Sequence, residues 1–212
     1  MGGEKGQNTK REILLKAVDL ASAEGLEALT IGRLADVLGM SKSGLFAHFG
    51  AKEKLQLAVV ETAREVFARE VLDPVGDVEP GLARLLALAD SWLRYVEKGV
   101  FRGGCFFAAV SAEVDDRPGR VRDRVVDLTR SWLELLETEA EVARDAGHLD
   151  LEPAQLAFEI HAFVQEANWA FQLHGEAEAF RRAGLAMRRS ITAAAIGDGR
   201  HILDRLNRRQ GR

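Results

Sequence analysis

The chain has 212 residues, of which 47% are apolar and 29% are charged, and this length suits one domain, or a small domain joined to a larger one. The net charge of −4 excludes a polycation, so any surface that binds nucleic acid must gather its basic groups on one face. The single cysteine excludes an internal disulfide and favours a reducing compartment.

The N-terminus carries no sign of secretion. Residues 1–12, MGGEKGQNTKRE, lack the apolar segment of a signal peptide, and no apolar run of the chain is long enough to cross a bilayer. We therefore expect a cytoplasmic protein, with the first eight residues forming a mobile tail.

The composition predicts an all-α fold. Proline is scarce, helix-favouring Ala, Leu, Arg and Glu are abundant, and no stretch alternates β-branched and polar residues over a strand's length. Caps and glycines divide the chain into about nine predicted helices, at 8–25, 29–40, 41–49, 51–72, 81–98, 105–114, 119–146, 153–173 and 177–196 or further.

The second and third of these helices follow the helix-turn-helix plan. Thr30 is placed to cap one helix and Gly39 to end it, and Ser41 then caps a short helix that Gly50 closes. In such a pair, the second helix can enter the major groove of DNA.

The short third helix sorts its side chains into a packed face and a bare face. At 3.6 residues per turn, Leu45 and Phe49 share the packed side, whereas Ser43, Gly44 and Ala47 share the opposite side, where a base edge can come close. Cationic or aromatic side chains flank that face or open the next helix: Lys42, Phe46, His48, Lys52 and Lys54. On pattern alone, a DNA-reading face and a plain helical corner with solvated lysines are equally good interpretations.

Residues 9–60 resemble the DNA-binding domain of the TetR family of bacterial transcriptional regulators. The resemblance lies in LTIGRLADVLGMSKSGLFAHFGAKEKL, residues 29–55. The family pattern has a capping Thr, an Ile/Leu-Ala pair, a turn Gly, then Ser-x-x-x-[Leu/Val/Ile]-Tyr-x-His-Phe and Lys-Glu-x-Leu. Here these positions are Thr30, Leu34, Ala35, Gly39, Ser41, Leu45, Phe46, His48, Phe49, Lys52, Glu53 and Leu55.

The resemblance implies two domains with different functions. Residues 1–54 would form the tail and a three-helix DNA-binding domain, residues 55–212 a helical effector-binding and dimerisation domain, and the helix over 51–72 would link them. Such a regulator would be a repressor, released from a palindromic operator by a small molecule. It would be no enzyme and would need no cofactor.

The resemblance also implies which residues contact DNA. Phosphate contacts would come from Lys10, Thr30, Ser41, His48 and Lys52, and base contacts from Ser43, Gly44 and Ala47, with Lys42 and Arg33 as further candidates. Phe46 departs from the pattern, which has a tyrosine at this position. The tyrosine hydroxyl commonly touches a DNA phosphate, and phenylalanine has no such group. A face this poor in bidentate donors is expected to depend on phosphate contacts and DNA shape.

An effector pocket is predicted in the C-terminal part from recurring aromatic and polar residues. His161, Gln165 and Asn168 follow an i, i+4, i+7 line on an otherwise apolar helix, and this stripe suits a ligand pocket and a subunit interface equally well. Cys105 fits a small buried hydrophobe better than a reactive thiol. The candidate pocket comprises Trp92, Phe101, Cys105, Phe106, Trp132, His161, Gln165, Asn168 and Trp169.

The last two long helices are predicted to form the dimer interface, as the corresponding pair does in the family. The candidate residues are small or apolar: Ala157, Ile160, Val164, Phe171, Ala183, Met187 and Ile191. A two-fold dimer presents two reading helices about one DNA turn apart, so the resemblance implies a palindromic operator.

Two other functions remain open on the sequence. The first is a helical carrier or enzyme that uses Cys105 or His161, although no nucleophile, base and orienting group are evident. His148, His161 and His174 are too scattered for a two-histidine metal site, so no metal is expected. The second is a dimeric regulator whose effector is another protein.

Overall fold

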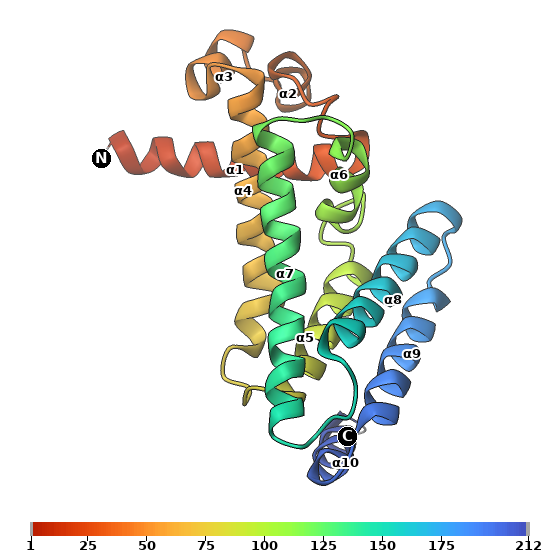
Figure 1. Ribbon diagram of the computed structural model, residues 1–212. Coiled ribbons are helices and arrows are strands. Elements are labelled where there is room, and N and C mark those ends of the chain that lie inside the picture. Colours follow the sequence, from red (N-terminus) through yellow and green to blue (C-terminus); the bar gives the residue numbers. More distant parts are fainter. Residues whose placement is uncertain (1, 211–212) are drawn as a thin grey trace. The chain divides into compact units, whose positions relative to one another are not determined.

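The computed structural model describes residues 2–210, and in that range the fold is all-helical, as predicted (Figure 1). Its only β pairing is an isolated bridge between Leu149 and Ala195. The helices are α1 (Gly2–Glu24), α2 (Ile31–Leu38), α3 (Lys42–Phe49), α4 (Lys52–Phe67), η1 (Ala68–Leu72), η2 (Asp73–Val75), α5 (Leu82–Glu97), α6 (Phe106–Val114), α7 (Arg120–Asp145), α8 (Pro153–His174), α9 (Glu178–Ala194) and α10 (Asp198–Gln210).

Both ends of the chain differ from the prediction. The predicted start of the first helix is wrong, because α1 already begins at Gly2 and includes Asn8 and Thr9, which were expected to cap it. The tail contains no proline, and a glycine inside a helix costs only about 1 kcal/mol, so the helix continues through it. At the other end, Gly197 adopts a φ of 49° and separates α10 from α9.

The chain divides into two compact units. The first comprises residues up to Phe67 together with Gly99–Thr129, and the second comprises Ala68–Lys98 together with residues from Arg130 onward. The helix formed by α4 and η1, and helix α7, each contribute residues to both units. The predicted boundary at residues 54 and 55 concerns function, and it stays a prediction.

In the first unit, α1 packs on α4 and α6, while α3 packs on both α2 and α4. Leu34, Leu45 and Leu55 bring α2, α3 and α4 together and are fully buried. Burying each such side chain stabilises the fold by roughly 1.5–3 kcal/mol, so the short α2 and α3 are held by tertiary packing.

In the second unit, α5 contacts η1, η2, α8, α9 and α10. Helices α8 and α9 run antiparallel side by side (Figure 1), and Gly175, with a φ of 71°, ends α8. Pro153 lies in the first turn of α8, as predicted.

No helix within residues 2–210 is both long enough and apolar enough to cross a bilayer.

Candidate nucleic-acid interface

Helix α3 has the capped geometry that the sequence predicts. The Ser41 side chain accepts a hydrogen bond from the Gly44 amide at 3.1 Å, and Gly50 ends the helix in the left-handed region with a φ of 69°. Leu45 and Phe49 point into the core, with exposed fractions of 0% and 5%. The cap and the two buried side chains fix which face of α3 meets the solvent.

The opposite face of α3 is bare, as the helical wheel indicates. Ser43 and Ala47 are exposed and Gly44 is half-buried, so only small side chains cover this face. Phe46 lies beside it and is 58% exposed. An aromatic ring in water gains nothing from burial within the chain, so this position suits contact with a partner.

Basic side chains lie on α3 and near it. Lys42 and His48 are exposed at its flanks. Lys10 comes from α1, and its ammonium group lies 5.7 Å from the centre of the Phe49 ring. Thr30 is exposed and caps α2 by accepting a hydrogen bond from the Arg33 amide at 3.0 Å. These positions leave the side chains open to a polyanion, and their contacts with DNA stay predictions.

Two predicted DNA contacts already have carboxylate partners. The Arg33 guanidinium donates two hydrogen bonds to Glu24, at 2.7 and 2.9 Å, and Lys52 forms an ion pair with Glu27. These hydrogen bonds lower the pKa values of the Glu24 and Glu27 carboxyls and raise the pKa of Arg33. A DNA phosphate that contacts Arg33 or Lys52 would therefore compete with the carboxylate for that cation.

The two acids were not evident from the sequence. Glu24 ends α1 and Glu27 lies in the following turn, nine and 25 residues from their partners. No local motif joins acids and bases at such separations, because the fold brings them together.

The predicted effector residues fall into two groups. Phe101, Cys105 and Phe106 are buried in the first unit, and Cys105 supplies the N-cap position of α6 with 2% of its surface exposed. The other predicted pocket residues belong to the second unit: Trp92, Trp132, His161, Gln165, Asn168 and Trp169.

Four residues of the second unit form a cluster. The Trp92 ring lies 5.3 Å from the rings of both Trp132 and His161, measured between centroids, and Gln165 approaches His161 at 3.3 Å. Burial lowers the pKa of His161, which favours the neutral imidazole. The indole N–H of buried Trp92 has no acceptor among the residues that the structure describes.

The remaining two pocket candidates differ in exposure. Asn168 is buried, whereas Trp169 is 52% exposed and its ring lies 5.1 Å from that of His174. Trp169 therefore presents a large part of its surface to the solvent.

The dimer prediction selected the wrong face of α8 and α9. Ile160, Val164 and Ile191 are fully buried in the chain's own core, so they have no surface to offer a second copy. Ala157, Ala183 and Met187 are also buried, and only Phe171 is half-buried. The error arose because α8 carries apolar residues on both sides, and its large exposed apolar residues are Phe158, Trp169 and Leu173.

Comparisons with known proteins match both parts of the chain. Residues 13–59 match the model of the bacterial regulatory proteins of the tetR family, and residues 81–187 match the tetracyclin repressor-like C-terminal domain. The HTH-type transcriptional repressor AcnR of Corynebacterium efficiens is 43% identical over 67 residues, which are 32% of this chain and 34% of that protein. AcnR of Corynebacterium glutamicum is 42% identical over 79 residues, 36% of this chain and 40% of that protein. The chain thus spans about a third to two fifths of the length of the curated relatives that it matches.

Solved structures share the fold over most of the chain. A TetR transcriptional regulator from Chloroflexus aurantiacus aligns with a TM-score of 0.82 and 24% identity, covering 91% of this chain and 98% of that one. AibR in complex with isovaleryl coenzyme A and operator DNA aligns with a TM-score of 0.65 and 23% identity, covering 82% and 96%. The two matched family models and the helix-turn-helix geometry agree, and the chain belongs to the TetR family of bacterial transcriptional regulators.

Proposed function

We propose that this regulator is a non-enzymatic repressor that binds a palindromic operator as a homodimer and leaves it when a small molecule binds its second unit. The observation that carries the proposal is the bare face of α3. Small residues expose the helix backbone there, and Lys42 and His48 lie exposed on its flanks. This arrangement lets a helix approach base edges while its flanks neutralise phosphates.

The cluster around Trp92 supports a small-molecule effector. It combines two indole rings, a neutral imidazole and an amide. A buried indole N–H without an acceptor loses the hydrogen bond it would make in water. A ligand with an apolar body and a hydrogen-bond acceptor restores that bond, so we propose this class of effector. Release requires the ligand to favour a conformation that binds the operator poorly.

The exposed stripe of α8 supports a homodimer. Phe158, Trp169 and Leu173 follow one line of the helix and are 66%, 52% and 62% exposed. Large apolar groups gathered on one helix face are typical of a surface that binds a partner. A second copy of α8 offers the same stripe, as a two-fold interface requires.

The operator is identified first. DNA fragments from upstream of the chain's own gene are tested for binding by gel shift, and footprinting of the bound fragment should reveal an inverted repeat. A reporter fused to that fragment should be silenced by the protein. Increased expression of the reporter would contradict repression, and absence of binding to any fragment would contradict the proposed function.

The reading face is tested with a triple variant, Lys42→Ala, Ser43→Ala and His48→Ala. We expect it to lose binding, because it removes an ammonium group, an imidazole ring and a hydroxyl group from α3. The matched control is Lys98→Ala, Ser190→Ala and His201→Ala, which changes the same residue types in the second unit. Full binding by the first variant would exclude α3 as the reading element.

The effector is sought by native mass spectrometry of the purified protein, which retains bound small molecules. A bound mass that is lost in the Trp92→Leu variant supports the proposed pocket. Copurification of a second protein in its place would favour a regulator whose effector is a protein.

A further inference from the structure

The turn between α1 and α2 is held by side chains from two distant elements. Both oxygens of the Glu113 carboxylate accept hydrogen bonds from consecutive backbone amides, Leu26 at 2.7 Å and Glu27 at 2.6 Å. Glu113 belongs to α6 and lies 87 residues from Leu26. Hydrogen bonds to a carboxylate are about twice as strong as those between neutral groups.

The backbone carbonyl of Leu26 is bound by a side chain from α4. The side-chain amide of Gln56 donates a hydrogen bond to the Leu26 carbonyl oxygen at 2.9 Å, and Gln56 itself is buried. Leu26 is 1% exposed. Its N–H and its C=O are therefore both fixed by buried or half-buried side chains from outside the turn.

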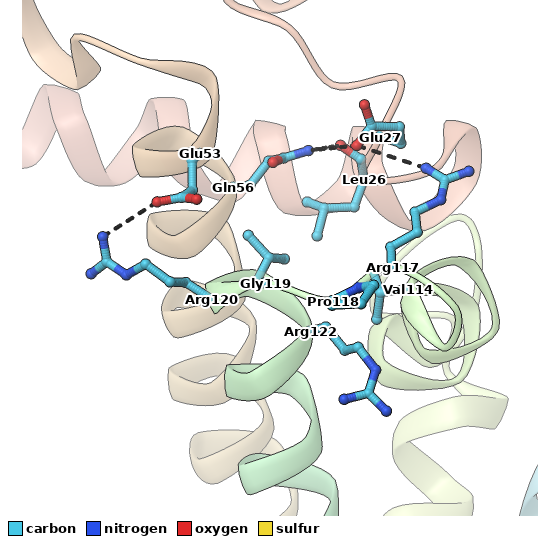
Figure 2. Close-up of a pocket in the computed structure, with 11 residues that line it drawn as sticks. Leu26, Glu27, Glu53, Gln56, Val114, Arg117, Pro118, Gly119, Arg120 and Arg122 are labelled. Carbon is cyan, nitrogen blue, oxygen red and sulfur yellow. Dashed lines mark hydrogen bonds and ion pairs between the residues drawn. The ribbon is translucent and has the colours of Figure 1, made fainter.

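The neighbouring contacts reinforce this clamp, which we define as Glu113 and Gln56 acting on Leu26. Gly25 has a φ of 93°, and a Cβ added there would lie 3.2 Å from the Glu113 carboxylate oxygens. Figure 2 shows the pocket beside the turn, of about 180 Å³, where Glu27 faces Arg117 at 3.8 Å. Glycine at position 25 thus leaves the space that the carboxylate occupies.

The segment that precedes α6 also contacts α1. The Asp19 carboxylate on α1 accepts hydrogen bonds from the backbone amide and the guanidinium of Arg102, at 3.0 and 2.7 Å. Gly103 lies so close that an added Cβ would be 1.8 Å from the Ser22 carbonyl oxygen. The residues just before α6 thus bind α1, and the end of α6 binds the turn that follows α1.

We infer that Glu113 is a positioning residue for DNA recognition: from α6, its carboxylate sets the turn from which α2 and α3 are presented to the operator. The inference rests on the proposed function. Leu26 lies five residues before the start of α2, and α2 carries the Thr30 cap at its start. A shift of the Leu26 and Glu27 amides is therefore passed directly to the reading elements.

The direction in which Glu113→Gln changes the affinity for DNA distinguishes a positioning role from a simple effect of charge. Glu113→Gln removes a negative charge, which on electrostatic grounds alone strengthens binding to DNA. Positioning predicts the opposite result, a loss of affinity of about tenfold, since an amide group cannot accept both hydrogen bonds through equivalent oxygens. The matched control is Asp116→Asn, the same charge change at a side chain that is 84% exposed.

Affinity is measured by fluorescence anisotropy with the operator fragment that the wild-type protein binds. Glu113→Gln should bind about tenfold more weakly, whereas Asp116→Asn should equal or exceed the wild type. Gln56→Leu should also weaken binding, and the double variant with Glu113→Gln should lose less than the product of the single effects, because both act on one turn. Equal or tighter binding by Glu113→Gln overturns the inference.

A measurement on the wild type keeps the inference testable if Glu113→Gln does not fold. Amide hydrogen exchange of Leu26 and Glu27 should be slow and comparable to that of core helix amides. Rapid exchange at both amides overturns the inference even if operator binding is intact. Slow exchange in a protein that binds no DNA supports the clamp while contradicting the proposed function, so the two failures are distinguishable.

Discussion

Phe46 on α3 stands where the family pattern has a tyrosine. Its ring is 58% exposed on α3, beside the bare face. A phenylalanine can contact DNA through its ring but has no donor for a phosphate oxygen. A substitution at position 46 that adds a hydroxyl therefore shows how much affinity one further phosphate contact contributes.

We expect Phe46→Tyr to raise operator affinity about tenfold, because a hydrogen bond to a charged group contributes roughly 1.5–3 kcal/mol. Anisotropy titrations with the operator fragment measure the change. Phe46→Leu serves as the control, since it also lacks a hydroxyl and should not gain affinity. Unchanged binding by Phe46→Tyr would show that this position does not reach a phosphate.

His161 makes stability depend on pH. Its pKa is lowered from 6.5 by burial. As the pH falls below 6.5, this residue is therefore protonated in the unfolded chain while it stays neutral in the folded protein. The free energy of unfolding should therefore fall as the pH decreases from 6.5 towards the lowered pKa. Above pH 6.5 the imidazole is neutral in both states, and this contribution is constant.

Thermal unfolding between pH 5 and 7 tests this sign, the interval being chosen about the ordinary histidine pKa of roughly 6.5. The wild type should lose stability towards pH 5 more steeply than the His161→Gln variant. His201→Gln, at an exposed position of α10, should keep the wild-type slope. Parallel curves for the wild type and His161→Gln would contradict a buried neutral imidazole.

At the scale of elements, glycine has opposite roles in α1 and at the end of α2. Gly39 has a φ of 64° with open space around it, and Gly6 lies within α1, also with nothing within 4 Å of an added Cβ. We expect Gly39→Ala to destabilise the protein by about 1 kcal/mol through backbone strain. Gly6→Ala should stabilise it by about 0.5 kcal/mol, because alanine favours helix.

Chemical denaturation measures both glycine variants. Because neither side chain meets a neighbour, the difference in sign depends only on backbone conformation. A stabilising effect of Gly39→Ala would show that the left-handed turn does not persist in solution.

The ends of the short helices could be predicted because their signals are local. Thr30, Gly39, Ser41 and Gly50 all act within four residues of their own positions, and each lies where it was expected. The clamp on Leu26 could not be predicted, because its two side chains come from residues 56 and 113 and nothing near the turn marks them. Contacts between distant segments are created by the fold.

The packed side of α8 could not be predicted from the sequence either. Its buried and exposed sides are both apolar, so the sequence pattern alone does not say which side packs within the chain. Ile160 and Val164 were assigned to a partner but belong to the core. Among the effector candidates, the Trp92 cluster could be anticipated from its residue types, while the separation of Phe101, Cys105 and Phe106 into the other unit could not.

For the whole molecule, we expect Trp169→Glu to dissociate the proposed homodimer. Trp169 lies at the centre of the exposed stripe of α8, and a carboxylate there would face its own copy across a two-fold axis, so that two like charges would be buried together. Analytical ultracentrifugation measures the change, with Leu185→Glu on α9 as the control. A dimer that withstands Trp169→Glu would place the interface elsewhere.

The pairs Arg33–Glu24 and Lys52–Glu27 have a consequence for the thermodynamics of operator binding. A lysine or arginine that enters a DNA complex from water displaces a condensed cation from the duplex, and the release of these cations makes affinity fall with ionic strength. If Arg33 and Lys52 contact phosphates as proposed, each exchanges a carboxylate for a phosphate, and the carboxylate left behind binds a cation from the solution. The number of cations released on binding is then smaller than the number of phosphates contacted. The affinity for the operator should therefore fall less steeply with salt concentration than the number of basic contacts suggests.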